Sequence, residues 1–269
     1  MRGTHVTRNF AHMPKPIIWV IAGVVALAAI GFGGHMYATH LTSQRALTPK
    51  ALGNGTAAAV SIPFTRVAVP SGDHTLIGWW VKARGEGGKP APAVLFLHPN
   101  ASTIADYVTL QRFFYRQGVS TFVFDYSGFG GSTGSASLSQ AVQDAAAAAK
   151  MFADSAGAAT RKVAFGSALG ATVLLQAIDS VGPRVNGIVI EGVDASVKEA
   201  GVRSGRIPSL LAWLVKDVGD NVAAAANVRV RTLAVQSKDD KRSPMEDAMR
   251  VTGAITAKVS LVKHWRKGH

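Results

Sequence analysis

Residues 162–171 read KVAFGSALGA, and this stretch decides the fold. Its apolar beginning predicts a short buried strand, and the residues from Leu169 onward have the composition and length of a helix. Gly166 and Gly170 flank the point at which the strand passes into the helix. Glycine permits both a sharp turn and a close approach of helix to strand. The stretch therefore predicts a strand that turns directly into a helix, which is the repeating unit of an α/β sheet.

Strands and helices alternate along most of the remaining chain. Apolar, β-branched runs predict strands at Thr65–Val69, Leu76–Lys82, Ala93–His98, Thr121–Asp125, Lys162–Phe165, Gly187–Glu191, Arg231–Gln236 and Lys258–Val262. Helix-length stretches lie at Ile104–Arg116, Leu138–Phe152, Leu169–Asp179 and Met245–Gly253. Ser71-Gly72-Asp73 is typical of a hairpin between the first two strands. The order predicts a mainly parallel eight-stranded sheet with helices on both faces, an antiparallel start and a small helical insertion at residues 195–226.

The composition excludes several classes of protein. The chain has 269 residues, of which 48% are hydrophobic and 17% charged, so it can bury a large core. It contains no cysteine, which excludes disulfide scaffolds, zinc ribbons and cysteine nucleophiles. The formal net charge is +13, but the basic residues are scattered and form no nucleic-acid-binding signature. We therefore expect no nucleic-acid partner and interpret the charge as a solvated basic surface.

The N-terminal region predicts a membrane anchor. Residues 17–34 form an uncharged stretch of 18 residues, which as a helix would span about 27 Å, close to the hydrocarbon thickness of a bilayer. Because basic residues precede it, we expect a cytoplasmic N-terminus at 1–16, a transmembrane signal-anchor helix at 17–37 and an extracytoplasmic domain, periplasmic or extracellular. A Gly- and Ala-rich linker is predicted at 38–60, ahead of a domain at 61–269. The alternatives are a cleaved signal peptide and a buried core helix.

Four motifs lie where predicted strands end, which is the edge at which open α/β sheets carry their chemistry. One is the turn at residues 165–171. The third strand ends in LHPNA at residues 97–101, and the fourth ends in DYSGFGGSTG at residues 125–134. The seventh strand runs into SKDDKRSP at residues 237–244.

In order and spacing these motifs resemble the α/β-hydrolase superfamily and, within it, the membrane-anchored Bem46-like serine hydrolases, also described as serine aminopeptidase-like. Residues 98–101 match H-G-N-A with Pro99 at the Gly, residues 125–134 match D-Y-R-G-x-G-x-S-x-G with Ser127 at the Arg, and residues 237–244 match G-x-x-D-x-x-x-P with Ser237 at the Gly. The resemblance covers about residue 60 to the C-terminus. It implies an α/β-hydrolase fold that hydrolyses small acyl esters or thioesters, or peptide-type amides, with no metal and no organic cofactor.

The nucleophile is where the chain departs from this family. The family places G-x-S-x-G at the strand-to-helix turn, which lifts a serine hydroxyl above the sheet. Here Gly166 and Gly170 hold the glycine positions and Ala168 holds the serine position, and alanine has no nucleophilic atom. Ser167 lies one residue early in this frame. Ser132 lies in a second G-x-S-x-G string, which reads as a glycine-rich loop because it lacks the direct strand–Ser–helix connection.

The resemblance implies the other roles of a serine-hydrolase site. Asp240, four residues before Pro244, is expected to be the acid, and His269 is expected to be the base because it follows Gly268 as in the family's Gly-His ending. The alternatives are Asp239 and Asp194 for the acid and His264 for the base. The oxyanion hole would use the backbone N–H groups of Asn100 and Leu169.

Three interpretations of Ala168 are open. The chain could be a serine hydrolase inactivated at one position, a pseudoenzyme that binds an acyl or peptide ligand near the membrane, or a structural domain carried by its anchor. A residue with a Cβ at such a turn is strained by about 1–3 kcal/mol, and a fold kept only for stability would relax it. We therefore expect a membrane-anchored protein of hydrolase type with little or no activity. In the insertion, Leu210, Leu211 and Trp213 could cover an acyl pocket or could pack against the core.

Overall fold

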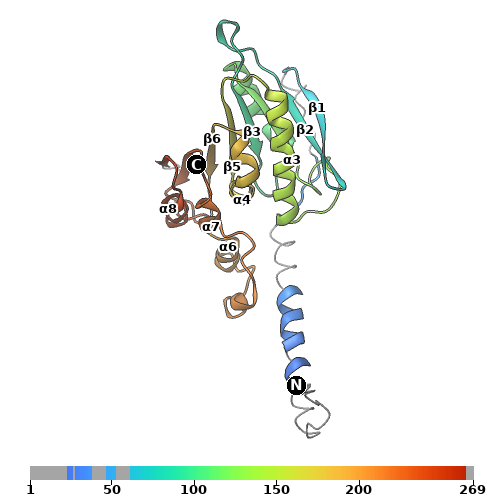
Figure 1. Ribbon diagram of the computed structural model, residues 1–269, viewed down its shortest axis with the longest axis vertical. Coiled ribbons are helices and arrows are strands. Elements are labelled where there is room, and N and C mark those ends of the chain that lie inside the picture. The colour runs from blue at the N-terminus through green and yellow to red at the C-terminus, as the bar shows by residue number, and fades with distance from the viewer. Residues whose placement is uncertain (1–22, 27, 38–46, 53–60, 265–269) are drawn as a thin grey trace, which may run out of the picture.

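The computed structural model describes residues 23–26, 28–37, 47–52 and 61–264. Its centre is a sheet of eight strands (Figure 1). They are β1 (Thr65–Ser71), β2 (His74–Val81), β3 (Ala93–Leu97), β4 (Ser120–Phe124), β5 (Lys162–Ser167), β6 (Gly187–Glu191), β7 (Arg231–Ser237) and β8 (Val259–His264). Their order is β1-β2-β4-β3-β5-β6-β7-β8. The pairs β1–β2 and β2–β4 are antiparallel and the other five pairs are parallel, so the predicted mainly parallel sheet with an antiparallel start is confirmed.

Alternating side chains of the central strands fill two cores, one on each face of the sheet. In β3, Leu95 and Leu97 belong to the larger core and Phe96 to the smaller one, and all three are fully buried. The larger core receives side chains from α3 and α4, which lie over the same face (Figure 1), and the smaller core receives side chains from α2. Because a central strand is buried on both faces, it appears in the sequence as an unbroken apolar run.

The helices follow the strands where they were predicted. They are η4 (Ile104–Tyr107), α2 (Val108–Arg116), α3 (Leu138–Ala156), α4 (Leu169–Gln176), α5 (Ile178–Val181) and α8 (Met245–Ala254), with short 3-10 turns η3 (Glu86–Gly88) and η5 (Gly182–Arg184). The Ser137 hydroxyl begins α3 by accepting a hydrogen bond from the Gln140 N–H at 3.1 Å. The helix ends at Gly157, whose φ of 46° favours glycine. It therefore runs beyond the predicted end at Phe152.

The stretch at residues 195–226 contains α6 (Val197–Arg203), the 3-10 segment η6 (Ser209–Leu214) and α7 (Asn221–Ala225). Ile207 and Val215 are buried, whereas Leu210 is 82% and Trp213 is 76% exposed. Packing against the core therefore explains only part of the apolar pattern of this insertion. The exposed residues form a tip on η6.

The helical residues 23–26 and 28–37 project away from the sheet (Figure 1). Ile30 and Phe32 are 71% and 69% exposed. Ring nitrogen Nδ1 of His35 hydrogen-bonds to the carbonyl of Leu214, so this helical segment contacts η6. Within the described ranges, no helix is both long enough and apolar enough to cross a membrane. Residues 1–22, 27, 38–46 and 53–60 of the predicted cytoplasmic segment, anchor and linker lie outside the described residues, so the anchor stays a prediction.

Residues 47–52, inside the predicted linker, pack against the domain. Leu47 is 5% exposed and belongs to the larger core. The Lys50 carbonyl accepts a hydrogen bond from the Gly130 N–H at 2.8 Å, and the Lys50 ammonium lies 3.0 Å from an Asp106 carboxylate oxygen. Ala51 forms a parallel bridge with Gly130. The chain ahead of the domain is thus held against the loops that follow β3 and β4.

Candidate active site

Ala168 forms the turn between β5 and α4, with φ 50° and ψ −109°. Its N–H donates to the carbonyl of Glu191 at the end of β6 (2.8 Å). Its own carbonyl accepts from the N–H groups of Ala171 (3.0 Å) and Thr172 (3.2 Å) in the first turn of α4. A residue with a Cβ is strained by about 1–3 kcal/mol in such a conformation. The Ala168 side chain is exposed and lines a cavity at this edge of the sheet.

Gly166 and Gly170 allow this turn to pack closely. A Cβ on Gly166 would lie 2.4 Å from the Gly170 carbonyl oxygen, and a Cβ on Gly170 would lie 2.0 Å from the Leu97 carbonyl oxygen. Both obstacles are backbone atoms, which have no rotamer to change. Ser167 is the last residue of β5 and pairs in register with Glu191. The strand therefore carries Ser167, and the turn carries Ala168.

The expected oxyanion donors lie on either side of this turn. Leu169 is the first residue of α4, and the first N–H groups of a helix have no partner within the helix. Asn100 follows β3, and its side-chain Oδ1 accepts from the N–H groups of Thr48 (2.7 Å) and Ala101 (3.0 Å). The structure brings Asn100, Leu169 and Ala168 to one cavity. The contact from Thr48 shows that the segment ahead of the domain supports the Asn100 loop, which the sequence did not indicate.

Asp240, the expected acid, lies in the loop between β7 and α8. Its Oδ1 accepts from the N–H groups of Arg242 (2.8 Å) and Ser243 (3.1 Å). Both hydrogen bonds are made to Oδ1, and they stabilise the loop. Neither of these two N–H groups binds Oδ2. Asp239 is exposed in the same loop.

Asp194, the remote alternative for the acid, lines the cavity after β6. Its Oδ1 lies 2.7 Å from an Arg203 guanidinium nitrogen, and the same nitrogen lies 3.0 Å from Asp247 of α8. Burial raises the pKa of Asp194 to about 6, against the opposing effects of a Ser243 hydrogen bond and the Arg203 charge. The ion pairs of Arg203 with Asp194 and Asp247 connect α6 to the end of β6 and to α8. The Asp194 carboxylate therefore has a structural role.

The expected base lies outside the described residues. His264 is the last residue of β8 and pairs in register with Ser237 at the end of β7. The chain thus leaves the sheet beside the loop that carries Asp240. His269 follows five residues beyond that point. The roles of both histidines stay predictions.

The glycine-rich loop uses the Ser132 hydroxyl for structure. Ser132 Oγ donates to the carbonyl of Asp125 (2.7 Å) and accepts from the N–H of Ile77 (2.9 Å). A Cβ on Gly130 would lie 1.9 Å from Oδ2 of Asp125, and the Gly131 N–H donates to that oxygen at 3.2 Å. The loop is folded back onto β2 and β4, and Ser132 secures it there.

A buried histidine lies beneath the Asn100 loop. His98 is fully buried, and its ring centroid lies 4.4 Å from that of Tyr126. Burial lowers the pKa of His98 to about 4 and raises the pKa of Asp125, whose Oδ1 lies 3.9 Å from His98 Nε2, to about 6. His98 is therefore neutral at pH 7 and serves as packing. The sequence motif contained this histidine but gave no sign of its burial.

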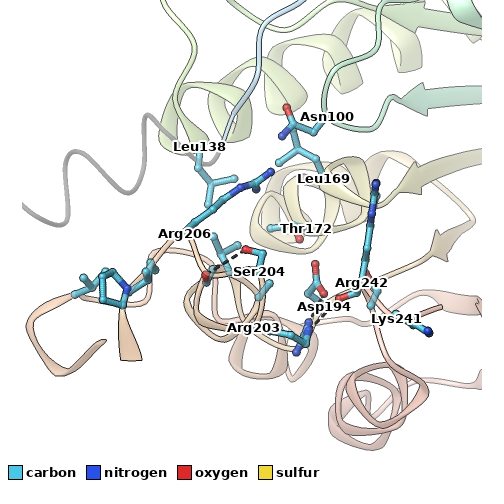
Figure 2. Close-up of a pocket in the computed structure, with 18 of the residues that line it drawn as sticks. Asn100, Leu138, Leu169, Thr172, Asp194, Arg203, Ser204, Arg206, Lys241 and Arg242 are labelled. Atoms are coloured by element: carbon cyan, nitrogen blue, oxygen red, sulfur yellow. Dashed lines mark hydrogen bonds and ion pairs between the residues drawn. The ribbon is translucent and has the colours of Figure 1, made fainter. Parts of the chain in front are cut away.

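A cavity of about 630 Å³ opens beside Ala168 (Figure 2). One side is formed by the domain, through Asn100, Leu169 and neighbouring residues, and the other by α6, η6 and the segment between them. Arg206 and Arg242 extend from opposite sides toward Leu169 (Figure 2). That Arg206 and Arg242 line one cavity could not be predicted from the sequence, because no pattern in the chain links the insertion to the loop after β7.

Comparison with known proteins supports this architecture. Residues 88–264 match the family model described as "Serine aminopeptidase, S33". The chain is 26% identical over 234 residues to the uncharacterized protein Rv2307c of Mycobacterium tuberculosis, covering 86% of this chain and 82% of that protein. It is 24% identical over 183 residues to protein bem46 of Schizosaccharomyces pombe (65% and 59%) and 28% identical over 141 residues to the uncharacterized membrane protein YNL320W of Saccharomyces cerevisiae (51% and 48%). The chain thus spans about half to three-fifths of the two fungal relatives.

Solved structures share the fold at low sequence identity. The esterase Pf2001 of Pyrococcus furiosus superimposes with a TM-score of 0.65 at 19% identity, covering 82% of this chain and 88% of the esterase. The acylaminoacyl peptidase of Pyrococcus horikoshii superimposes with a TM-score of 0.56 at 18% identity, covering 77% of this chain and 37% of the peptidase. These similarities establish an α/β-hydrolase fold. Together with the family match, they confirm the resemblance inferred from the motifs: the chain belongs to the serine aminopeptidase (S33) family of α/β hydrolases.

Proposed function

We propose that this chain is a membrane-anchored S33-family protein of esterase or thioesterase type whose site lacks its nucleophile. The observation that carries the proposal is Ala168, which combines the positive φ of a strand-to-helix turn with a place in the cavity wall. Without a hydroxyl there, no covalent acyl-enzyme can form. We therefore expect the chain to turn over esters slowly or not at all.

A serine at position 168 would complete a defined reaction path. Its Oγ would attack the acyl carbon while the imidazole of His269, held in the required tautomer by Asp240, took the hydroxyl proton. The N–H groups of Asn100 and Leu169 would hold the oxygen that becomes negative in the tetrahedral intermediate. Return of the proton to the leaving alcohol or thiol would leave an acyl-serine, which water would hydrolyse by the same steps in reverse. In the proposed path, the attacking oxygen is the atom that Ala168 does not supply.

The membrane anchor belongs to the same proposal. The exposed side chains of Val24, Ile30 and Phe32 support it, because a lone helix in water gains nothing from apolar side chains on its surface. In this arrangement the N-terminus is cytoplasmic and the domain lies on the other side of the membrane. The absence of cysteine from the chain makes single-cysteine accessibility in intact cells a direct test of that topology. A cysteine introduced in the domain should react with an impermeant maleimide, and one at residue 8 should not.

A binding function without chemistry is the second candidate. The cavity of about 630 Å³ favours it, since that volume falls in the range of ligand pockets and is retained beside an inert side chain. The chain would then hold an acyl or peptide ligand near the membrane without turning it over.

Hydrolysis of p-nitrophenyl esters distinguishes the two candidates. The unmodified full chain, Ala168→Ser and Ala168→Ser/Asp240→Asn would be compared, with circular dichroism as the check on folding. We expect turnover in Ala168→Ser alone, with a loss on the order of 10⁴ when the acid is neutralised. No turnover by folded Ala168→Ser would favour the binding function. Robust turnover by the unmodified chain would contradict the proposal.

A further inference from the structure

The cavity beside Ala168 carries a positive charge that acyl transfer does not require. Arg206, Lys241 and Arg242 line it. Among the residues that the structure describes, none of the three forms an ion pair. All three are exposed at the rim, where their charge is available to a ligand.

Asp194, the acidic residue among those that line the cavity, is already paired. Asp194 and Asp247 both lie within ion-pair distance of Arg203, at 2.7 and 3.0 Å. Arg203 also donates to the carbonyl of Arg242 at 3.0 Å, so it is fixed in place and neutralised. Arg206 and Arg242 therefore extend toward the cavity without compensation from these carboxylates, whereas the Lys241 side chain points away from it (Figure 2).

The wall of the cavity that the insertion forms is mostly apolar. The apolar side chains there are Val197, Ile207, Leu211, Leu214 and Val215, with Leu138 of α3 beside them. A cavity with an apolar wall and a cationic rim is complementary to a molecule with one apolar part and one negative part. A neutral ester would leave the guanidinium groups unpaired, and a cationic ligand would be repelled.

We propose that this cavity binds an anionic amphiphile, a molecule with one long apolar chain and a carboxylate or phosphate head group. The chain lies along the apolar wall, and the head group lies between Arg206 and Arg242, whose side chains extend toward Leu169 from opposite sides (Figure 2). Arginine suits this role because its planar fork binds both carboxylate and phosphate. The inference rests on the proposed function, in which the same cavity receives the acyl group of the ester.

The surroundings of the cavity suit an amphiphile of low solubility. Leu210 and Trp213 alternate on η6 with the cavity residues Leu211 and Leu214 and are largely exposed. The same segment contacts the N-terminal helical residues through the hydrogen bond between His35 and Leu214. The segment η6 therefore carries apolar side chains both on the outside of the insertion and in the cavity wall.

Photo-crosslinking tests this site in the full chain. The protein would be placed in phosphatidylcholine nanodiscs and irradiated with a diazirine-bearing palmitate, and labelled peptides would be identified by mass spectrometry. We expect labelling within residues 197–215. Palmitate and hexadecyl phosphate should compete at least about tenfold better than hexadecanol or hexadecyltrimethylammonium. The competitors share one chain length, so the comparison isolates the head group.

Arginine variants connect the head group to the rim. Arg206→Gln/Arg242→Gln should lower the labelling about tenfold, and each single variant should lower it less. Arg231→Gln is the matched control, because Arg231 is exposed at the amino end of β7, at the other edge of the sheet. Equal competition by all four amphiphiles, or equal labelling of the folded double variant, would overturn the inference. If the double variant fails to fold, the two single variants decide.

Two further arms separate related outcomes. Lysophosphatidylglycerol, which has one acyl chain, should reduce the labelling when added to the nanodisc if a membrane lipid supplies the head group. It should leave the labelling unchanged if the ligand is a free anionic amphiphile. Both results support the charge-selective site. Hydrolysis of uncharged p-nitrophenyl esters by Ala168→Ser is a separate readout. Charge-selective labelling without that hydrolysis would contradict only the proposed function. Hydrolysis without charge-selective labelling would contradict only this inference.

Discussion

Replacing Ala168 with glycine should stabilise the protein. At φ 50° and ψ −109° a residue with a Cβ carries about 1–3 kcal/mol of strain that glycine does not carry. Glycine loses about 0.5–1 kcal/mol more conformational free energy on folding, which opposes this gain. The Ala168 side chain is exposed, so removing its methyl group sacrifices little buried area. The free energy of unfolding should therefore rise by about 0.5–2 kcal/mol.

Thermal unfolding of the full chain in detergent, followed by tryptophan fluorescence, measures this change. For a domain of this size the predicted gain raises Tm by about 1–8 °C. The matched control is Ala153→Gly within α3, where the backbone is helical and glycine should lower the free energy of unfolding by about 1 kcal/mol. If Ala168→Gly lowers the free energy of unfolding as much as Ala153→Gly does, the prediction is wrong, because the backbone at residue 168 would then not be strained.

Three further changes test the surroundings of the site. Gly170→Ala should lower the free energy of unfolding in urea by at least about 2 kcal/mol, because its Cβ would lie 2.0 Å from the Leu97 carbonyl oxygen. Burial lowers the pKa of His98 from 6.5 to about 4. Between pH 6.5 and about 4 the native state therefore binds fewer protons than the unfolded state, and stability is lost as the pH falls through this range. His98→Asn should make Tm depend less on pH in the same range. Ser132→Ala should cost about 1–2 kcal/mol by leaving the Ile77 N–H unpaired, without abolishing hydrolysis by Ala168→Ser.

Each of these predictions has a control or a contrary result. Gly182→Ala should be well tolerated, since a Cβ there would meet only the Ile178 side chain at 3.7 Å. Equal losses for Gly170→Ala and Gly182→Ala would show that α4 can shift away from β3. If Tm depends on pH in His98→Asn as it does in the unmodified chain, other titratable groups cause that dependence. Loss of hydrolysis on adding Ser132→Ala to a folded Ala168→Ser variant would place Ser132 in the chemistry.

The fold could be predicted because its signals are local. Strands buried on both faces appear as apolar runs, and the turn at Gly166 and Gly170 appears as a pair of glycines at a fixed spacing. The glycine contacts found there, with the backbone of Leu97 and of the helix itself, are the physical reason for that spacing.

The details of the site could not be predicted because they depend on distant segments. Arg206 and Arg242 lie 36 positions apart in the chain and line one cavity only because the insertion folds over the end of the sheet. Leu47 and Thr48 read as part of a polar linker, yet they reach the core and the Asn100 side chain. No periodicity encodes such contacts, so composition suggested a solvated basic surface and a featureless linker instead.

Labelling of Ala168→Ser with a fluorophosphonate tests whether position 168 is the nucleophile position of a serine-hydrolase site. The probe reacts with a serine hydroxyl only where a base activates it, and fragmentation of the peptide spanning residues 163–184 locates the adduct. We expect an adduct at position 168 in the variant, its loss in Ala168→Ser/Asp240→Asn, and no adduct in the unmodified chain. An adduct on Ser167 or Ser132 of the unmodified chain would contradict the account, because the protein would then hold an active nucleophile outside the turn.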